Sequence, residues 1–303
     1  MKRILFFTFI IILTPLIIIN LFTVVDEIKF HSVFSKVIRV KDVSKNKIFD
    51  VSFEEYIKGV LAGEMPASFE LEALRAQAVA ARSYVLVQMN KNKNNDYDVV
   101  NTVDNQVYLT DEVLKKKWKD DYEKKIEKIQ KAVVSTNGEY LTYNNEVAET
   151  LFFSTSVGKT ENSEEVFSAK VPYLRSVSSV WDESSPVFTD TSTFSLTDFY
   201  SKLGLDYNND LRIDVLAKTS TGRVKKIKIN GYDFDGKDVA SKLGLRSNFF
   251  EILKNNDKVT INTKGYGHGV GMSQYGAEGM AKEGYTYDKI LKHYYIGTEI
   301  KKN

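Results

Sequence analysis

Residues 61–85 read LAGEMPASFELEALRAQAVAARSYV, and this stretch predicts the end of one helix, a short joint and a second helix. In the second helix, apolar side chains recur three and four residues apart at Leu71, Leu74, Ala78, Ala81 and Val85. That spacing is typical of a single buried helical stripe. The small residues of AQAVAA would let another element approach this helix closely.

Both helices carry start or stop signals. Ser52 and Glu55 form the S-x-x-E pattern of a capping box, so the first helix is expected to start at Ser52. Gly63 fits the residue just past its end. Ser68 is the expected N-cap of the second helix, with acidic residues in the first turn that follows.

Composition indicates a folded, cysteine-free protein. The chain has 303 residues, of which 43% are hydrophobic and 27% charged, a balance typical of globular domains. Its formal net charge of +2 is too small to indicate nucleic-acid binding. Because there is no cysteine, disulfides and thiolate metal sites are excluded.

The N-terminus predicts a membrane anchor over residues 1–26. Residues 4–25 are almost entirely apolar, and as a helix they would span about 33 Å, enough to cross a bilayer core of about 30 Å. Lys2 and Arg3 precede the run and Asp26 and Glu27 follow it, which places the N-terminus in the cytoplasm and residues 27–303 outside. A cleaved signal peptide is the alternative, but the run is long for one and no small-x-small pattern ends it.

The remaining pattern predicts an α+β fold of mixed helices and antiparallel strands around a substrate cleft. Residues 27–50 alternate as strands, residues 111–135 form a charged helix, and residues 140–143 pair with 147–156 as a hairpin. Asn230 and Gly231 mark another hairpin turn. No internal repeat is apparent, and residues 180–262 are expected to form an accessory β-rich subdomain.

Glu64 is the first candidate for chemistry. The negative end of a helix and apolar neighbours such as Leu61, Met65 and Phe69 would disfavour its ionised form and raise its pKa. A glutamate with a raised pKa can act as a general acid near neutral pH. The alternative is an ordinary exposed carboxylate in a turn.

Arg75 and Arg82 lie seven residues apart, so they share one face of the second helix. Two guanidinium groups on one face suit a substrate that carries carboxylates. Surface arginines paired with glutamates are the alternative.

Two further clusters contain candidate binding residues. Ser154, Thr155 and Ser156 precede a glycine and could hydrogen-bond a sugar, or simply form a polar turn. The stretch GYGHGVGMSQYG surrounds His268 with glycines, and Ser273 is expected to cap the helix that follows. Neither a dinucleotide fingerprint, a phosphate-binding loop nor an H-E-x-x-H zinc motif fits the sequence.

Taken together, EEYIKGVLAGEMPASFELEALRAQAVAARSYVL, STSVGKTENSEEVF, VPYLRSV and GYGHGVGMSQYGAEGMAKEGYTYDKILKHYY resemble the stage II sporulation protein D family, which also includes an amidase enhancer. The resemblance extends over about residues 50–297. It implies a lytic transglycosylase that cuts the β-1,4 bond after N-acetylmuramic acid during forespore engulfment. The expected substrate is peptidoglycan stripped of stem peptides, and the expected product has a 1,6-anhydro end.

The resemblance also assigns residues and partners. Glu64 matches the family's catalytic glutamate, and Arg75 and Arg82 match basic positions around its cleft. Substrate binding is further expected from the serine-rich and glycine-rich motifs: Ser154, Thr155, Ser156, His268, Gln274 and Tyr275. The implied partners are an amidase and endopeptidase and a membrane scaffold protein. No cofactor, metal or nucleic acid is expected.

The chain departs from the family where many members read HSTSGG, because Phe153 and Val157 stand here in place of a histidine and a glycine. Two readings compete with the enzyme. One is a non-catalytic peptidoglycan-binding module that stimulates a partner amidase, and the other is a membrane scaffold built on residues 111–135.

Overall fold

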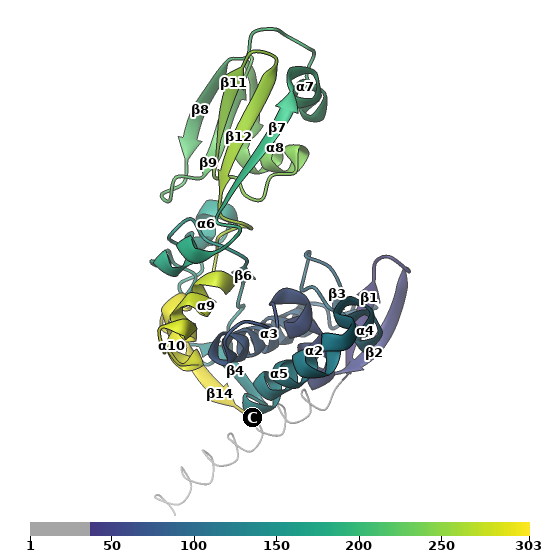
Figure 1. Ribbon diagram of the computed structural model, residues 1–303. Coiled ribbons are helices and arrows are strands. Elements are labelled where there is room, and N and C mark those ends of the chain that lie inside the picture. Colours follow the sequence, from purple (N-terminus) through teal and green to yellow (C-terminus); the bar gives the residue numbers. More distant parts are fainter. Residues whose placement is uncertain (1–36) are drawn as a thin grey trace, which may run out of the picture.

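The computed structural model describes residues 37–303 and has two lobes (Figure 1). The prediction of mixed helices and antiparallel strands is confirmed. The expected membrane anchor, residues 1–26, lies outside the described residues. Within residues 37–303, no helix combines the length and apolar character needed to cross a membrane.

The first lobe contains residues 37–188 and the chain after residue 264. Its elements are β1 (Val37–Asp42), β2 (Lys47–Ser52), α2 (Phe53–Glu64), α3 (Leu71–Lys91), β3 (Val99–Val100), α4 (Asp111–Trp118), η1 (Lys119–Asp121), α5 (Tyr122–Ser135), β4 (Glu139–Tyr143), β5 (Glu146–Val147), β6 (Phe152–Phe153), α6 (Ser163–Val166), η2 (Val180–Ser184), β13 (Met272–Ser273), α9 (Gln274–Lys282), α10 (Tyr287–Tyr294) and β14 (Glu299–Lys302). Its small sheets have the strand orders β2-β1-β3, β14-β4-β5 and β13-β6.

Helix α3 is the centre of the first lobe's core. It packs against α2, α5, α9, α10 and β4, and the alanines of AQAVAA are fully buried. The prediction that small residues would let other elements approach closely is confirmed. Because α3 has neighbours on most sides, most of its surface is apolar or small instead of presenting one narrow stripe.

The predicted start of the first helix at Ser52 is confirmed in position, and the predicted N-cap of the second helix, Ser68, is wrong. Ser52 is the N-cap of α2, but its side chain makes no capping hydrogen bond. Helix α3 begins at Leu71 with Glu70 as N-cap instead of Ser68. The Glu278 carboxylate, 208 residues away, accepts from the Glu70 backbone N–H at 2.6 Å, so a tertiary contact replaces the local cap.

Two other predicted elements are shorter than expected. The charged helix over residues 111–135 is broken at Lys119, whose φ of 47° ends α4 before η1 and α5. Of residues 147–156, Val147 pairs with β4 and the Ala148 N–H donates to the Leu141 carbonyl of β4 at 2.9 Å, while β6 pairs in parallel with β13. Strand β6 therefore joins distant parts of the chain instead of closing a local hairpin.

The second lobe adjoins the first lobe near α6 (Figure 1). It contains two three-stranded antiparallel sheets, β10-β9-β8 and β11-β12-β7, and a separate hydrophobic core formed by residues between 196 and 261. Its elements are β7 (Thr189–Ser195), α7 (Leu196–Leu203), β8 (Ile213–Lys218), β9 (Val224–Ile229), β10 (Tyr232–Asp235), α8 (Gly236–Leu243), β11 (Phe250–Asn255) and β12 (Lys258–Lys264). The Asn230-Gly231 turn between β9 and β10 is confirmed, with φ of 47° and 88°.

A short repeat in the second lobe escaped the sequence analysis. The sequence SKLGL occurs at residues 201–205 and again at 241–245, at the ends of α7 and α8. In both copies the glycine is left-handed, and the following leucine N–H donates to the carbonyl five residues earlier. This is the Schellman arrangement, which ends a helix, and the leucine that follows packs partly buried against the core of the second lobe.

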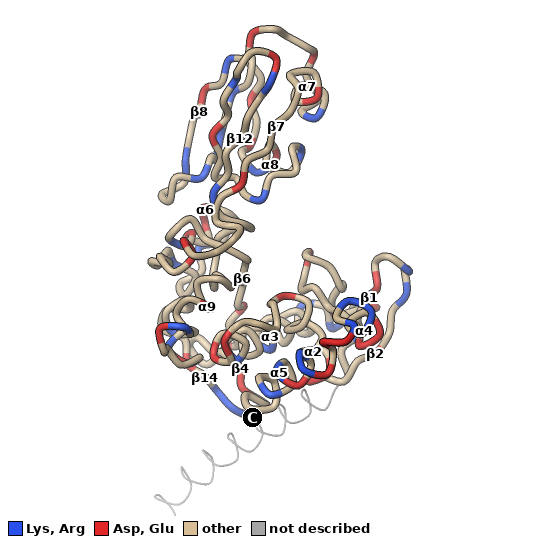
Figure 2. The backbone as a smooth tube through the Cα atoms, in the orientation of Figure 1, with Lys and Arg blue, Asp and Glu red and all other residues tan. Residues whose placement is uncertain are grey.

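Charged residues of both signs are interspersed over the two lobes (Figure 2). The 42 basic and 40 acidic residues of the sequence nearly cancel, so the fold has no large excess of either sign.

Candidate active site

Glu64 is the last residue of α2 and its side chain is half-buried. The Val107 backbone N–H donates to its Oε1 at 2.7 Å, and the Gln274 Nε2 donates to its Oε2 at 3.2 Å. Burial raises the pKa of Glu64, and these two hydrogen bonds to the carboxylate partly oppose the rise. The carboxyl group is therefore held in a fixed orientation and favours its protonated form more than an exposed glutamate does.

The segment that donates to Glu64 is itself anchored by buried polar contacts. Asn105 Nδ2 donates to the Tyr84 hydroxyl at 3.0 Å, and the Tyr56 hydroxyl donates to the fully buried Gln106 at 3.2 Å. This segment carries no recognisable motif in the sequence, in which the amide residues Asn105 and Gln106 simply precede the apolar Val107.

Glycines bring α2 against this segment. Gly63 is inside the helix and does not terminate it, which corrects the prediction, and a Cβ there would lie 2.3 Å from the Val107 carbonyl oxygen. A Cβ at Gly59 would lie 2.7 Å from the carbonyl oxygen of Leu109. Only glycine allows so close an approach, and this approach places the Val107 N–H beside Glu64.

The glycine-rich motif reaches Glu64 through the start of α9. The prediction of Ser273 as N-cap is confirmed, since its Oγ accepts from the Gly276 N–H at 3.3 Å. Gln274 follows and contacts Glu64, 210 residues away in sequence. Tyr275 donates its backbone N–H to the Ser154 carbonyl at 3.0 Å. Its ring packs edge-on against Phe69, with 5.0 Å between ring centroids.

Of the three predicted hydroxyl residues, Ser154 is partly exposed next to Tyr275, whereas Thr155 and Ser156 are fully buried. The Thr155 hydroxyl hydrogen-bonds the Ser185 hydroxyl at 3.0 Å, and the Ser156 hydroxyl donates to Asp182 at 2.7 Å. The hydroxyls of Thr155 and Ser156 are thus engaged inside the protein, and their expected role in sugar binding stays a prediction.

His268 is fixed as a neutral ring. Its Nε2–H donates to the Phe152 carbonyl at 3.0 Å, and its Nδ1 accepts from the Val270 N–H at 3.1 Å. Burial lowers the pKa of His268 to about 4, and the nearby positive charge of Arg223 contributes to the lowering. With both nitrogens used, His268 holds β6 and the glycine-rich segment together, and the structure does not bring it to Glu64.

The two arginines face the end of α5. Arg75 forms an ion pair with Glu72 at 2.5 Å and donates to the Ser135 hydroxyl at 2.9 Å. Arg82 is 0% exposed, forms an ion pair with Glu54 at 2.8 Å and donates to the Val133 carbonyl at 2.9 Å.

The prediction that the two arginines share a face of α3 is confirmed. The Arg82 guanidinium is enclosed between α2 and α5, and its expected contact with substrate stays a prediction. Its partner Glu54 lies at the opposite end of α2 from Glu64, about 15 Å away along the helix axis.

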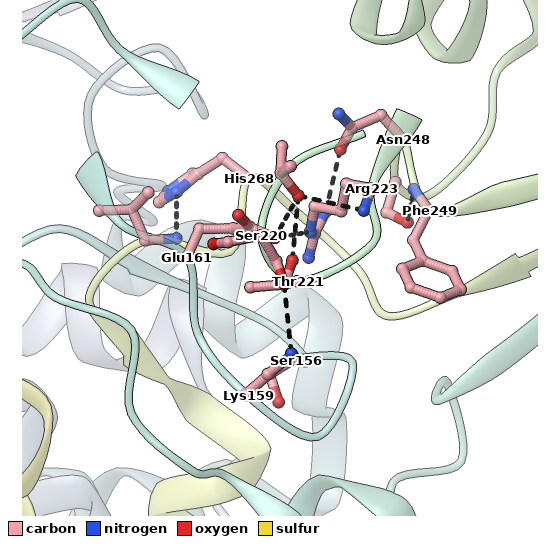
Figure 3. Close-up of polar contacts among 12 residues, drawn as sticks. Ser156, Lys159, Glu161, Ser220, Thr221, Arg223, Asn248, Phe249 and His268 are labelled. Atoms are coloured by element: carbon pink, nitrogen blue, oxygen red, sulfur yellow. Dashed lines mark hydrogen bonds and ion pairs between the residues drawn. The ribbon is translucent and has the colours of Figure 1, made fainter. Parts of the chain in front are cut away.

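A buried ion pair joins the two lobes. Arg223, from the β8–β9 connection, lies with its Nε 3.2 Å from the Glu161 Oε1, and both side chains are 0% exposed (Figure 3). The Arg223 Nη1 also donates to Asn248 at 3.1 Å and to the Gly267 carbonyl at 2.9 Å. Burial lowers the pKa of Arg223 to about 10 and raises the pKa of Glu161, and their mutual attraction opposes both shifts. Sequence spacing gave no sign of this pair.

Asp182 is a second buried acid that the sequence analysis missed. It lies in η2 and accepts hydrogen bonds from Ser156, Ser179 and Ser273. Burial raises the pKa of Asp182, and these hydrogen bonds oppose the rise. Its position after a tryptophan in an otherwise polar stretch carries no sequence signal of burial.

Comparison with known proteins agrees with the resemblance in the sequence. A family model described as SpoIID, stage II sporulation protein, matches residues 41–143. The chain is 45% identical over 268 residues to stage II sporulation protein D of Bacillus subtilis (strain 168), an alignment that covers 87% of this chain and 78% of that protein. The protein of the same name from Bacillus amyloliquefaciens is 44% identical over 262 residues, covering 85% of this chain and 76% of that protein.

A more distant relative is the amidase enhancer of Bacillus subtilis (strain 168), which is 30% identical over 301 residues. That alignment covers 80% of this chain and 40% of that protein. The identity and coverage with the two Bacillus sporulation proteins establish the family. This chain belongs to the stage II sporulation protein D family.

Proposed function

We propose that this chain is a peptidoglycan lytic transglycosylase that uses Glu64 as its single catalytic acid and base. The substrate is a glycan strand free of stem peptides, and the bond cut is the β-1,4 bond between N-acetylmuramic acid and N-acetylglucosamine. The observation that carries the proposal is the setting of Glu64, a partly buried, oriented carboxyl group with a raised pKa.

The reaction needs one carboxyl group in two protonation states. Protonated Glu64 donates its proton to the glycosidic oxygen, and the bond from that oxygen to C1 of the muramic acid breaks. The sugar's own 6-hydroxyl then attacks C1 and gives its proton to the Glu64 carboxylate, which restores the acid. No water is consumed, so the second carboxylate of an ordinary glycosidase has no role here.

The surroundings of Glu64 support this assignment. Its pKa is set by burial and by two uncharged donors, the Val107 N–H and the Gln274 amide. Burial favours the protonated form before cleavage, and the two donors stabilise the carboxylate that forms afterwards. Both steps therefore receive support from groups that already contact Glu64.

Product analysis tests the proposal. The full-length protein is incubated with denuded glycan strands, and the products are separated and weighed by mass spectrometry. We expect 1,6-anhydromuramyl ends from the wild type and from Glu123→Gln, a change at an exposed glutamate of α5. Glu64→Gln should lose at least about 100-fold of the rate, the smallest usual contribution of acid–base catalysis. Products with reducing ends would identify a hydrolase instead.

The second candidate function is stimulation of a partner amidase without cleavage. The observation that favours it is the 30% identity to the amidase enhancer. A Glu64→Gln variant that stimulates an amidase as well as the wild type, in a protein that releases no anhydro products, would establish this function in place of the first.

The location and partners are part of the same proposal. The apolar residues 4–25 anchor the chain in the cell membrane, with residues 27–303 on the outer side. There the chain acts during engulfment with an amidase and endopeptidase that strips stem peptides, and with a membrane scaffold protein. Protease digestion of intact cells tests the orientation, since only an external domain is cut. Co-purification after crosslinking tests the partners.

A further inference from the structure

Asp182 is a fully buried carboxylate whose donors in the described chain are all uncharged. Its Oδ1 accepts from the Ser156 backbone N–H at 3.0 Å and from the Ser273 hydroxyl at 2.5 Å. Its Oδ2 accepts from the Ser156 hydroxyl at 2.7 Å and from the Ser179 hydroxyl at 2.5 Å. A buried carboxylate is costly unless its oxygens are satisfied, and here four donors satisfy them.

These donors come from segments that are far apart in sequence. Ser156 follows β6 and Ser179 precedes η2, whereas Ser273 lies at the junction of β13 and α9. Asp182 therefore ties the start of α9 to the strand region beside it. The helix N-terminus carries partial positive charge, which favours a carboxylate in contact with the N-cap.

The start of α9 is also the part of the chain that reaches Glu64. Ser273 is its N-cap, and the next residue, Gln274, donates to the Glu64 Oε2 at 3.2 Å. Tyr275 is held by the Ser154 carbonyl at 3.0 Å. A shift of Ser273 would therefore move the Gln274 amide, because the two residues are adjacent in the first turn.

We propose that Asp182 is a positioning residue of the Glu64 site: by holding Ser273, it fixes the first turn of α9 so that Gln274 donates to the Glu64 carboxylate. Asp182 does not touch Glu64 and acts through Gln274. The importance of this contact for cleavage rests on the proposed function, but the contact itself does not.

The experiment measures the titration of Glu64 in the full-length protein by ¹³C NMR of labelled glutamate carboxyl groups. The Glu64 signal is assigned by its loss in Glu64→Gln. The variants compared are Asp182→Ala, Asp182→Asn, Gln274→Ala and the double variant Asp182→Ala/Gln274→Ala. Because the Gln274 hydrogen bond lowers the pKa of Glu64, Gln274→Ala should shift the titration upward.

The proposal expects Asp182→Ala to shift the titration upward by at least half as much as Gln274→Ala does. In the double variant, the shift should be no larger than with Gln274→Ala alone. Loss of the Asp182 charge by itself would shift the titration downward, since a nearby negative charge raises a carboxyl pKa. The direction of the shift therefore separates positioning from simple electrostatics.

Asp182→Asn is the matched control. Its amide oxygen can still accept from Ser156 and Ser273, and its NH₂ can donate to hydroxyls that rotate to accept. We expect its titration to lie closer to the wild type than to Asp182→Ala. Should Asp182→Ala fail to fold, Ser273→Ala provides the same test, with the same upward shift expected.

Three results would overturn the proposal: a titration of Glu64 that is unchanged or shifted downward in Asp182→Ala, a shift that persists undiminished in the Gln274→Ala background, or equal shifts with Asp182→Asn and Asp182→Ala. The proposed cleavage reaction fails separately, if Glu64→Gln still releases anhydro products. The titration results stand in that event, because they do not depend on activity.

Discussion

Replacing Glu64 by glutamine should remove activity and at the same time stabilise the protein at neutral pH. Because burial raises the pKa of Glu64, the native state binds the proton more tightly than the unfolded chain does. The wild type therefore loses stability as the pH rises above the ordinary glutamate pKa of about 4.3. Glutamine stays neutral at every pH and has no such loss.

The size of the effect follows from linkage. Each unit by which the native pKa exceeds the ordinary one corresponds to about 1.4 kcal/mol of unfolding free energy lost at neutral pH. The contacts of Glu64 should survive the change. The amide oxygen of the introduced glutamine can accept from the Val107 N–H, and Gln274 can turn its own amide so that its oxygen faces the new NH₂ group.

Urea unfolding at pH 4 and pH 7 measures the effect. Trp118 and Trp181 both lie in the first lobe, so their fluorescence reports the unfolding of the lobe that contains Glu64. We expect Glu64→Gln to equal the wild type at pH 4 and to exceed it at pH 7. The control Glu123→Gln should stay within about 0.5 kcal/mol of the wild type at both pH values.

A Glu64→Gln variant that is less stable than the wild type at pH 7 would refute this reasoning. So would a difference that is the same at pH 4 and pH 7. Either result would mean that the two donors favour the carboxylate at least as much as burial disfavours it, and Glu64 would then be a structural hydrogen-bond acceptor with an ordinary or lowered pKa.

Arg223→Met leaves Glu161 buried without its cation and should lower the unfolding free energy by about 3–5 kcal/mol. Adding Glu161→Gln should recover part of that loss, and additive losses in urea unfolding would contradict the pairing. Gly271→Ala places a methyl group 1.9 Å from a backbone carbonyl oxygen at a φ of +83°, and its melting temperature should fall well below that of Gly284→Ala, which has a similar φ of +86° but open space. His268→Gln should gain about 3 kcal/mol of unfolding free energy relative to the wild type as the pH falls from 6.5 to 4. The native pKa of His268 is about 4, so over this range the wild type loses stability because the histidine protonates in the unfolded chain. A pH-independent difference in urea unfolding would contradict this.

Local patterns in the sequence predicted local structure well where the backbone angles and hydrogen bonds of a segment are determined within that segment. The Asn230-Gly231 turn adopts the left-handed angles that a tight hairpin requires, and Asn and Gly tolerate these angles better than other residues. Ser273 caps α9 because its hydroxyl reaches an N–H only three residues along the chain. The direction of the Glu64 pKa shift was also predicted, since its apolar neighbours are adjacent in sequence.

Prediction failed where the hydrogen-bond partner of a backbone group comes from a residue distant in sequence instead of from a neighbour. Helix α3 begins at Leu71 because Glu278 accepts from the Glu70 N–H, so Ser68 was not needed as a cap. Strand β6 pairs with β13 instead of continuing the local hairpin. Hydrogen-bond donors and acceptors can be counted from a sequence, but their partners across the fold cannot.

The sequence by itself determined the family, the two-helix joint that carries Glu64, and the residue types available for acid–base chemistry. These follow from residue spacing and composition, which can be read directly from the sequence. Only the tertiary structure decided that Gln274 contacts Glu64, that Asp182 holds the start of α9, and that Arg82 is enclosed by α2 and α5. The physical reason is that burial and hydrogen-bond partners depend on which segments pack together, and residues as far apart as 64 and 274 are brought together only by the tertiary fold.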